Sequence, residues 1–190
     1  MSMQTAELLA ITPTLTIREV NEWDAVTLAD YVAEIADERP NNTAIRRAMF
    51  PMSADGIREL LRRYREDGGS LFLVAEHEGE IAGMIRMTRG DAPYRRHVVT
   101  LSINLRRDMR GMGLGRRMMQ EALAWAQTQP DIQRIELEAL TRNRAALRVY
   151  ERLGFHVEGI HRKMYQLTDE DGAPFVDTVV MTYPLDDETP

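Results

Sequence analysis

A glycine- and arginine-rich run lies where a predicted strand turns directly into a predicted helix. The run occupies residues 110–117 and is written RGMGLGRR. Before it, apolar residues alternate at 99, 101, 103 and 105, as in a strand. After it they recur at 114, 118, 122 and 125, as on one face of a helix. Glycines let the backbone approach a ligand closely, and the first amides of a helix have no internal partner. The turn is therefore predicted to bind an anion, most simply a pyrophosphate.

The same turn has three other interpretations. The turn can be no more than a tight connection between a strand and a helix. A Walker A motif needs Lys and then Ser or Thr after its last glycine, but Gly115 is followed by Arg116. A dinucleotide-binding fingerprint needs a third glycine at the position of Arg116, although Glu136 lies at the distance where that fold keeps its ribose-binding acid. Neither nucleotide motif fits.

The composition predicts one globular domain and argues against a nucleic-acid partner. The chain has 190 residues, of which 44% are hydrophobic, and its net charge is −6. An acidic protein is a poor ligand for DNA or RNA phosphates. Basic residues nevertheless gather around the glycine turn, which favours a small, multiply charged anion, or else only a solvated helix face. These basic residues are Arg106, Arg107, Arg110, Arg116 and Arg117.

The sequence holds no cysteine, so a disulfide and a thiolate nucleophile are excluded. The four histidines show no metal-ligand spacing, and no metal is expected. No apolar stretch approaches the roughly 20 residues that cross a bilayer, and no secretory signal is visible. The expected protein is soluble and cytoplasmic and has no membrane partner.

The chain is predicted to alternate strands and helices within one domain at residues 14–185. Residues 1–13 are expected to form a flexible arm and residues 186–190 an acidic tail. Asp24, Ser53 and Asn143 are candidate N-caps, and Glu78-Gly79 marks a hairpin. The predicted strands are Leu15 to Val20, Leu71 to Ala75, Ile81 to Met87, Val98 to Leu105, Arg134 to Leu140, Phe155 to Gly159 and Phe175 to Tyr183; the helices are Asp24 to Asp37, Ser53 to Glu66, Gly113 to Gln127 and Asn143 to Leu153.

This order of elements, together with two motifs, resembles the GCN5-related N-acetyltransferase (GNAT) family. The first motif is R-x-x-G-x-G at Arg110, Gly113 and Gly115. The second lies about thirty residues on, at residues 143–155, and matches N-x-x-A-x-x-x-Y-x-x-x-G-F. The ending Asp177 to Met181, with Gly159 after the Gly154-Phe155 pair, further resembles the branch that acetylates polyamines, amino acids and ribosomal-protein termini. The resemblance implies an α/β (α+β) fold, with a mixed, mostly antiparallel sheet of about seven strands and about four helices, ordered β-α-α-β-β-β-α-β-α-β-β.

The resemblance also implies transfer of an acetyl group from acetyl-CoA to an amine of a small molecule or peptide. The pyrophosphate of CoA would bind at Arg110, Gly111, Met112, Gly113, Leu114, Gly115 and Arg116. The pantetheine arm would pair with the backbone of Ile103, Asn104 and Leu105. Asn143 would hydrogen-bond this arm, and it is equally a helix N-cap. The family also allows a homodimer. A non-catalytic acyl-CoA sensor with the same fold is the alternative function.

Tyr150 is the candidate catalytic residue. Its helical spacing to Ala146, Leu147 and Leu153 favours a core position. The resemblance instead makes it the proton donor to the departing CoA sulfur. Without a cysteine or a Ser-His-Asp arrangement, direct attack by the amine is expected. The group that accepts the amine's proton stays open among Glu76, Glu138, His97, Asp91 and water.

Overall fold

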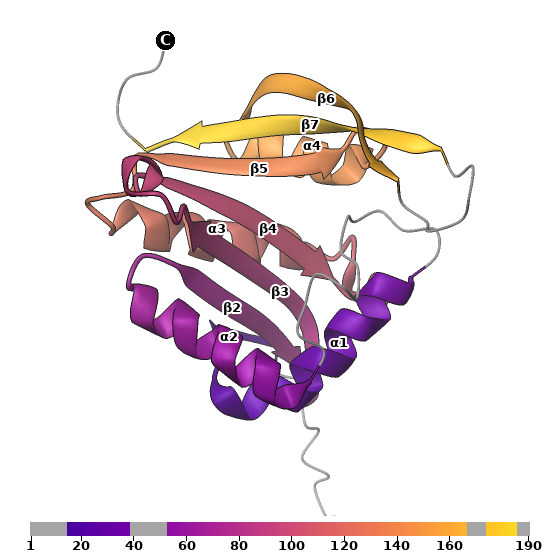
Figure 1. The fold of residues 1–190 in the computed structure, drawn as a ribbon. Coiled ribbons are helices and arrows are strands. Elements are labelled where there is room, and N and C mark those ends of the chain that lie inside the picture. The colour runs from indigo at the N-terminus through magenta and orange to yellow at the C-terminus, as the bar shows by residue number, and fades with distance from the viewer. Residues whose placement is uncertain (1–14, 39–52, 167–173, 186–190) are drawn as a thin grey trace, which may run out of the picture.

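The computed structural model describes residues 15–38, 53–166 and 174–185. They build a seven-stranded sheet with the order β1-β2-β3-β4-β5-β7-β6 (Figure 1). Neighbouring strands are antiparallel except β4 and β5, which pair in parallel. The mixed, mostly antiparallel sheet predicted from the sequence is thereby confirmed. The strands are β1 Leu15–Glu19, β2 Leu71–His77, β3 Glu80–Arg89, β4 Val98–Leu105, β5 Arg134–Leu140, β6 His156–Gln166 and β7 Phe175–Pro184.

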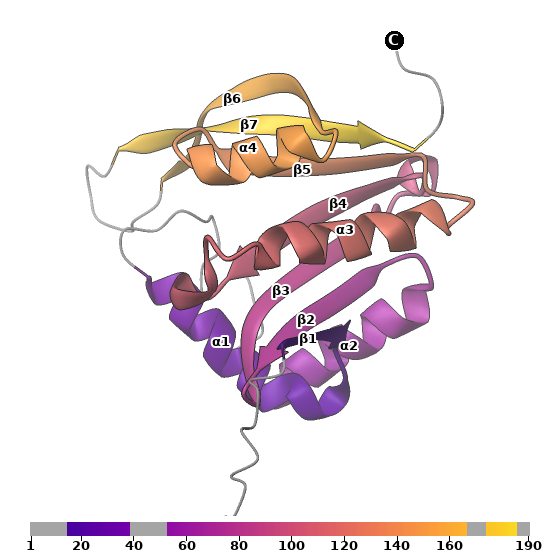
Figure 2. The same cartoon turned by 180° about the vertical axis from the view of Figure 1, so that it is seen from behind.

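Helices cover both faces of the sheet. Figure 1 shows the face that carries α1 and α2, and Figure 2 shows the opposite face with α3 and α4. The order of strands and α-helices is the predicted one. In the described ranges the helices are α1 Ala25–Asp37, α2 Ala54–Asp67, α3 Leu114–Gln127 and α4 Arg144–Arg152, with short 3-10 turns η1 Glu22–Asp24, η3 Pro93–Arg95 and η4 Arg107–Met109. The predicted arm, residues 1–13, and the predicted tail, residues 186–190, lie outside the described residues.

Strand β2 shows why the sheet is apolar on both sides. Phe72 and Val74 belong to the core cluster under α1 and α2. Leu71, Leu73 and Ala75 belong to the larger cluster under α3 and α4. A strand covered on both faces is a continuous apolar run rather than an alternating one. Burial of each large apolar side chain stabilises the fold by about 1.5–3 kcal/mol.

The predicted helix start at Ser53 and the predicted turns are confirmed. The Ser53 hydroxyl accepts a hydrogen bond from the Gly56 amide at 3.1 Å and so caps α2. Gly68, with φ of +65°, ends the helix in the left-handed conformation. Glu78 and Gly79 both have positive φ, and His77 pairs with Glu80, so a two-residue hairpin joins β2 to β3.

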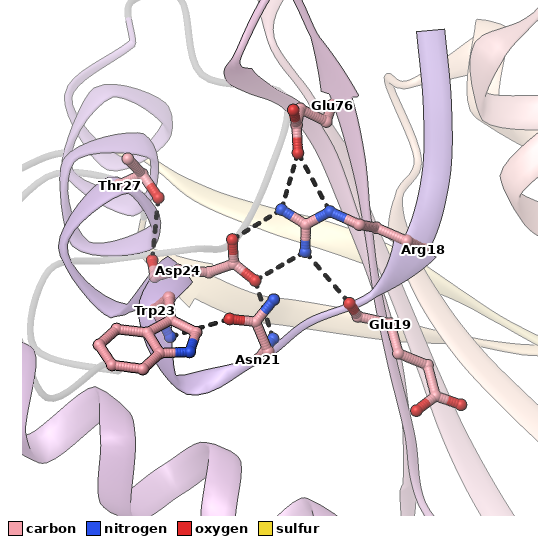
Figure 3. Close-up of polar contacts among 7 residues, drawn as sticks. All are labelled: Arg18, Glu19, Asn21, Trp23, Asp24, Thr27 and Glu76. Atoms are coloured by element: carbon pink, nitrogen blue, oxygen red, sulfur yellow. Dashed lines mark hydrogen bonds and ion pairs between the residues drawn. The ribbon is translucent and has the colours of Figure 1, made fainter.

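Asp24 precedes α1 at the predicted N-cap position, but its side chain does not cap the helix. The carboxylate makes no capping bond to α1. It instead accepts hydrogen bonds from the Arg18 guanidinium at 2.7 and 2.8 Å, and from the Asn21 amide at 2.8 Å (Figure 3). Arg18 also donates to Glu76 on β2 at 2.7 and 3.0 Å. This network ties β1, the start of α1 and β2 together. A buried carboxylate needs such a fixed cation, which outweighs the benefit of a cap.

The sheet opens between β4 and β5. Parallel pairing runs only from Val98 with Arg134 to Leu101 with Leu137. Both strands continue, β4 to Leu105 and β5 to Leu140, without pairing with each other. The splayed strand ends leave space for a ligand, and the glycine turn directly follows β4.

Candidate active site

A cavity of about 540 Å³ lies at the open ends of β4 and β5. The sequence predicted nine of its lining residues as cofactor contacts, and the structure brings them together. These are Ile103, Asn104, Leu105, Arg110, Gly111, Gly113, Gly115, Arg116 and Asn143. Tyr150 and Glu138 also line the cavity. Met112 and Leu114 do not, because Met112 is largely exposed and Leu114 is buried in the core. Only their backbone amides can serve the predicted role.

The glycine turn forms a cradle of unpaired backbone donors. Gly111 and Gly113 have φ of +77° and +84°, and a Cβ added at either residue would meet no atom within 4 Å. In the described part of the chain, the amides of residues 111–116 donate to no acceptor. Four of these residues line the cavity, and the positive end of the α3 dipole lies here. The cradle therefore fits a pyrophosphate by charge, by free donors and by space.

The Arg110 side chain supports the cradle from within the protein. Its guanidinium donates to both carboxylate oxygens of Glu38, at the end of α1, and to the Leu105 carbonyl. Hydrogen bonds from Arg110 lower the pKa of Glu38. Arg110 is thus already engaged, whereas Arg116 is exposed and has no ion-pair partner among the described residues. Of the two arginines, Arg116 is the one available to a phosphate.

Strand β4 and the start of α4 form the sides of the cavity. The Tyr31 hydroxyl on α1 donates to the Asn104 carbonyl at 2.8 Å and holds the end of β4 in place. Asn143 caps α4 by accepting the Ala146 amide at 3.3 Å. The predicted N-cap at Asn143 is confirmed, and its contact with the pantetheine arm stays a prediction.

Tyr150 lies on α4 between the core and the cavity. Its ring is 9% exposed and stands 6.0 Å from that of Phe155, centroid to centroid. No described residue accepts or donates a hydrogen bond at its hydroxyl. Buried tyrosine hydroxyls usually have a partner, so this one is suited to a ligand. Burial raises the pKa of Tyr150 to about 12, and the phenol stays protonated at neutral pH.

The structure separates the four candidate bases. Glu138 on β5 lines the cavity. Glu76 is bound by Arg18 on the side of β1 and is not among the lining residues. Asp91 and His97 precede β4, whereas the cavity lies at its other end. Asn104 lies seven residue steps along the chain from His97, which in a strand is about 23 Å. Only Glu138 is therefore placed to act on a ligand here.

Glu138 is held by residues of the last two strands. It accepts hydrogen bonds from the Thr178 hydroxyl, from His161 Nδ1 at 2.9 Å and from the Tyr165 hydroxyl at 3.0 Å. Burial disfavours its charge, but these bonds outweigh burial and the pKa of Glu138 is lowered. The sequence offered no local signal for Tyr165 and Thr178, because sheet pairing alone brings them to β5. Sequence reasoning also missed Met119, Ala139, Leu140, Ala145, Ala146 and Val149.

The described ranges contain neither a metal-binding cluster nor a membrane-spanning helix. No three His, Asp or Glu side chains there are placed to hold a metal ion. No helix in these ranges is long and apolar enough to span a bilayer.

Comparison with known proteins decides the family. Residues 29–155 match the family model described as "Acetyltransferase (GNAT) family". The chain belongs to the GNAT family. A curated relative, the L-amino acid N-acetyltransferase AaaT of Escherichia coli K12, is 29% identical to this GNAT chain over 91 residues, which is 48% of the chain. That match covers 56% of the relative, so the two are aligned over about half of each protein.

Solved structures share the whole GNAT fold. A GNAT-family acetyltransferase from Streptococcus pneumoniae has a TM-score of 0.82 at 26% identity, covering 90% of this chain and 99% of the other. The yncA acetyltransferase of Salmonella typhimurium, solved with acetyl-CoA, has a TM-score of 0.76 at 19% identity, covering 93% and 97%. A ribosomal-protein-S5-alanine acetyltransferase from Vibrio fischeri has a TM-score of 0.72 at 20% identity, covering 94% and 100%. The predicted family and fold are confirmed, and acetyl-CoA is the acetyl donor of this family.

Proposed function

We propose that this GNAT protein transfers the acetyl group of acetyl-CoA to a primary amine by direct attack. One observation carries the proposal. A buried tyrosine without a hydrogen-bond partner among the described residues lines the cavity whose other end is a cradle of free backbone amides. The cradle suits the diphosphate of the donor and the phenol suits a leaving group. The relatives' names include both amino-acid and ribosomal-protein acceptors and so do not select one acceptor for this chain.

The cofactor would lie along the splay of the sheet. The amides of residues 111–116 and the side chain of Arg116 would hold its pyrophosphate. The unpaired end of β4, from Ile103 to Leu105, would hold the pantetheine arm, with Asn143 opposite. Bound acetyl-CoA supplies the thioester, and the protein positions its carbonyl near Tyr150.

Tyr150 would give its proton to the CoA sulfur when the C–S bond breaks. A phenol of pKa about 12 is a weaker acid than a thiol of pKa about 8.5, so the transfer costs about 5 kcal/mol if the thiol is unperturbed. The same apolar surroundings disfavour the CoA thiolate as well, so the pKa of the CoA thiol rises toward that of the Tyr150 phenol. The remaining cost is within reach of a positioned proton donor.

The amine's proton would leave through water rather than rest on Glu138. Moving a proton from an alkylammonium to a carboxylate is strongly uphill, because a carboxylic acid is a far stronger acid than an ammonium ion. The hydrogen bonds that lower the pKa of Glu138 increase this cost. Glu138 is therefore better suited to stabilise positive charge on the nitrogen than to keep its proton.

The test is a thiol-release assay. Purified protein is mixed with acetyl-CoA and a panel of alkylamines, diamines, amino acids, amino-acid amides and short peptides. The proposal predicts amine-dependent release of free CoA, with one N-acetylated product formed for each thiol. Tight binding of acetyl-CoA without amine-dependent thiol release would instead identify a non-catalytic binding module.

A further inference from the structure

Glu138 differs in its partners from the other described carboxylates whose side chains are exposed to a similar or smaller extent. Its side chain is 26% exposed. Four other carboxylate side chains are between 10% and 27% exposed, and each binds an arginine. Asp24 binds Arg18, Glu38 binds Arg110, Glu136 binds Arg95 and Asp177 binds Arg162.

No arginine or lysine of the described residues lies within 4 Å of the Glu138 carboxylate. Its partners are two hydroxyl groups, of Thr178 and Tyr165, and one ring nitrogen of His161. The two hydroxyl donors orient the carboxylate and help to keep it ionised without cancelling its charge, and His161 adds a positive charge only when it is protonated. A carboxylate that has no arginine or lysine partner among the described residues is available to a ligand.

The position of Glu138 shows which ligand it would meet. Its neighbours Leu137 and Ala139 are buried in the cluster under α3 and α4, so Glu138 points to the opposite face, that of α1 and α2. Two other charged residues of the described ranges line the cavity. Arg110 is neutralised by Glu38, and Arg116 lies at the start of α3, at the cradle. Away from the cradle, the described residues therefore give the cavity wall a negative charge.

We infer that Glu138 is the counter-ion of the acceptor's ammonium group and makes the site selective for cationic amines over zwitterions. An amine next to a carboxamide or alkyl group binds, whereas a free α-amino acid brings a second carboxylate beside Glu138. The acceptor class is thus a peptide N-terminus, an amino-acid amide or an alkylamine. This inference rests on the proposed function, since the amine must share the cavity with the thioester.

The test compares two probes that differ in one group. L-Alaninamide and L-alanine are titrated at pH 7 into protein saturated with desulfo-CoA, which cannot transfer an acetyl group, and binding is followed by calorimetry. Most of each probe carries an ammonium group at this pH. We expect alaninamide to bind about tenfold or more tightly than alanine, because like charges repel at close range. Equal affinities, tighter binding of alanine, or binding of neither probe would overturn the inference.

Three variants assign the effect to Glu138. Glu138→Gln removes the charge and should bring the two affinities to within about twofold of each other. Glu138→Asp keeps the charge and should keep the preference, which shows that the loss is not a folding defect. Glu136→Gln is the matched control, because Glu136 lies on the same strand face but is already paired with Arg95 and Arg134. A preference that survives Glu138→Gln, or that Glu136→Gln also removes, contradicts the inference.

Turnover is measured separately with the same two probes and acetyl-CoA. Cation-selective binding without acetyl transfer to any amine would sink the proposed function and leave the charge selectivity standing. Transfer to both probes with equal kcat/KM and equal affinity would contradict the charge selectivity and leave the proposed function standing.

Discussion

Replacing Tyr150 with phenylalanine separates catalysis from packing. The substitution removes one hydroxyl and keeps the ring that contacts Phe155. Because no described residue hydrogen-bonds this hydroxyl, we expect the free energy of unfolding to change by less than about 1 kcal/mol. Tyr150 does not belong to the cradle at residues 111–116, so the affinity for acetyl-CoA should stay within about tenfold of that of the parent protein. Loss of the proton donor should lower kcat by roughly a hundredfold or more.

The assay follows free CoA with a thiol-reactive dye at saturating acetyl-CoA, using the best acceptor of the amine panel. Acetyl-CoA affinity is measured by calorimetry and stability by thermal unfolding. Tyr183→Phe is a suitable control, since the Tyr183 ring lies 5.4 Å from that of Phe155 but does not line the cavity. This control should turn over normally. A Tyr150→Phe variant with unchanged kcat would make Tyr150 a packing residue and refute the proposed acid.

Three further predictions concern the cradle, the fold and pH. Gly113→Val should weaken acetyl-CoA binding by tenfold or more, because φ is +84° and the new side chain enters open space at the cradle; unchanged calorimetric affinity would contradict this. Arg18→Met should lower the free energy of unfolding by about 2 kcal/mol or more, since it leaves Asp24 without its cation; a denaturant titration within 0.5 kcal/mol of the parent would disprove it. The pKa values of Asp24, Glu38 and Glu138 are lowered by folding, so the unfolded chain binds more protons in acid. The stability that these three carboxylates contribute should therefore be fully present above about pH 5 and be lost as the pH drops below about 4, and a stability rise in acid would contradict the assignments.

Local sequence patterns predicted the elements that local chemistry determines. The glycine turn, the Ser53 cap, the two-residue hairpin and the Asn143 cap each depend on residues within a few positions of one another. Such features follow from backbone preferences and from orphan amides at helix ends.

Features built by distant residues could not be predicted. Asp24 was expected to cap a helix, but Arg18 and the burial of the carboxylate set its role. Arg110 lines the cavity, as predicted, but the contact of its guanidinium with Glu38, 72 residues away, is not visible in any local pattern. The wall around Glu138 combines β5, β6 and β7, and the register of these strands is not visible in any one segment.

The central claim is that the free amides at the start of α3 hold the diphosphate of the cofactor. Amide chemical shifts of isotopically labelled protein test it directly, with CoA and pantetheine as matched ligands, because pantetheine lacks the diphosphate. We predict that CoA shifts the amide resonances of residues 111–116 strongly, whereas pantetheine leaves them nearly unmoved. Unchanged resonances for residues 111–116 in protein saturated with CoA would contradict the account.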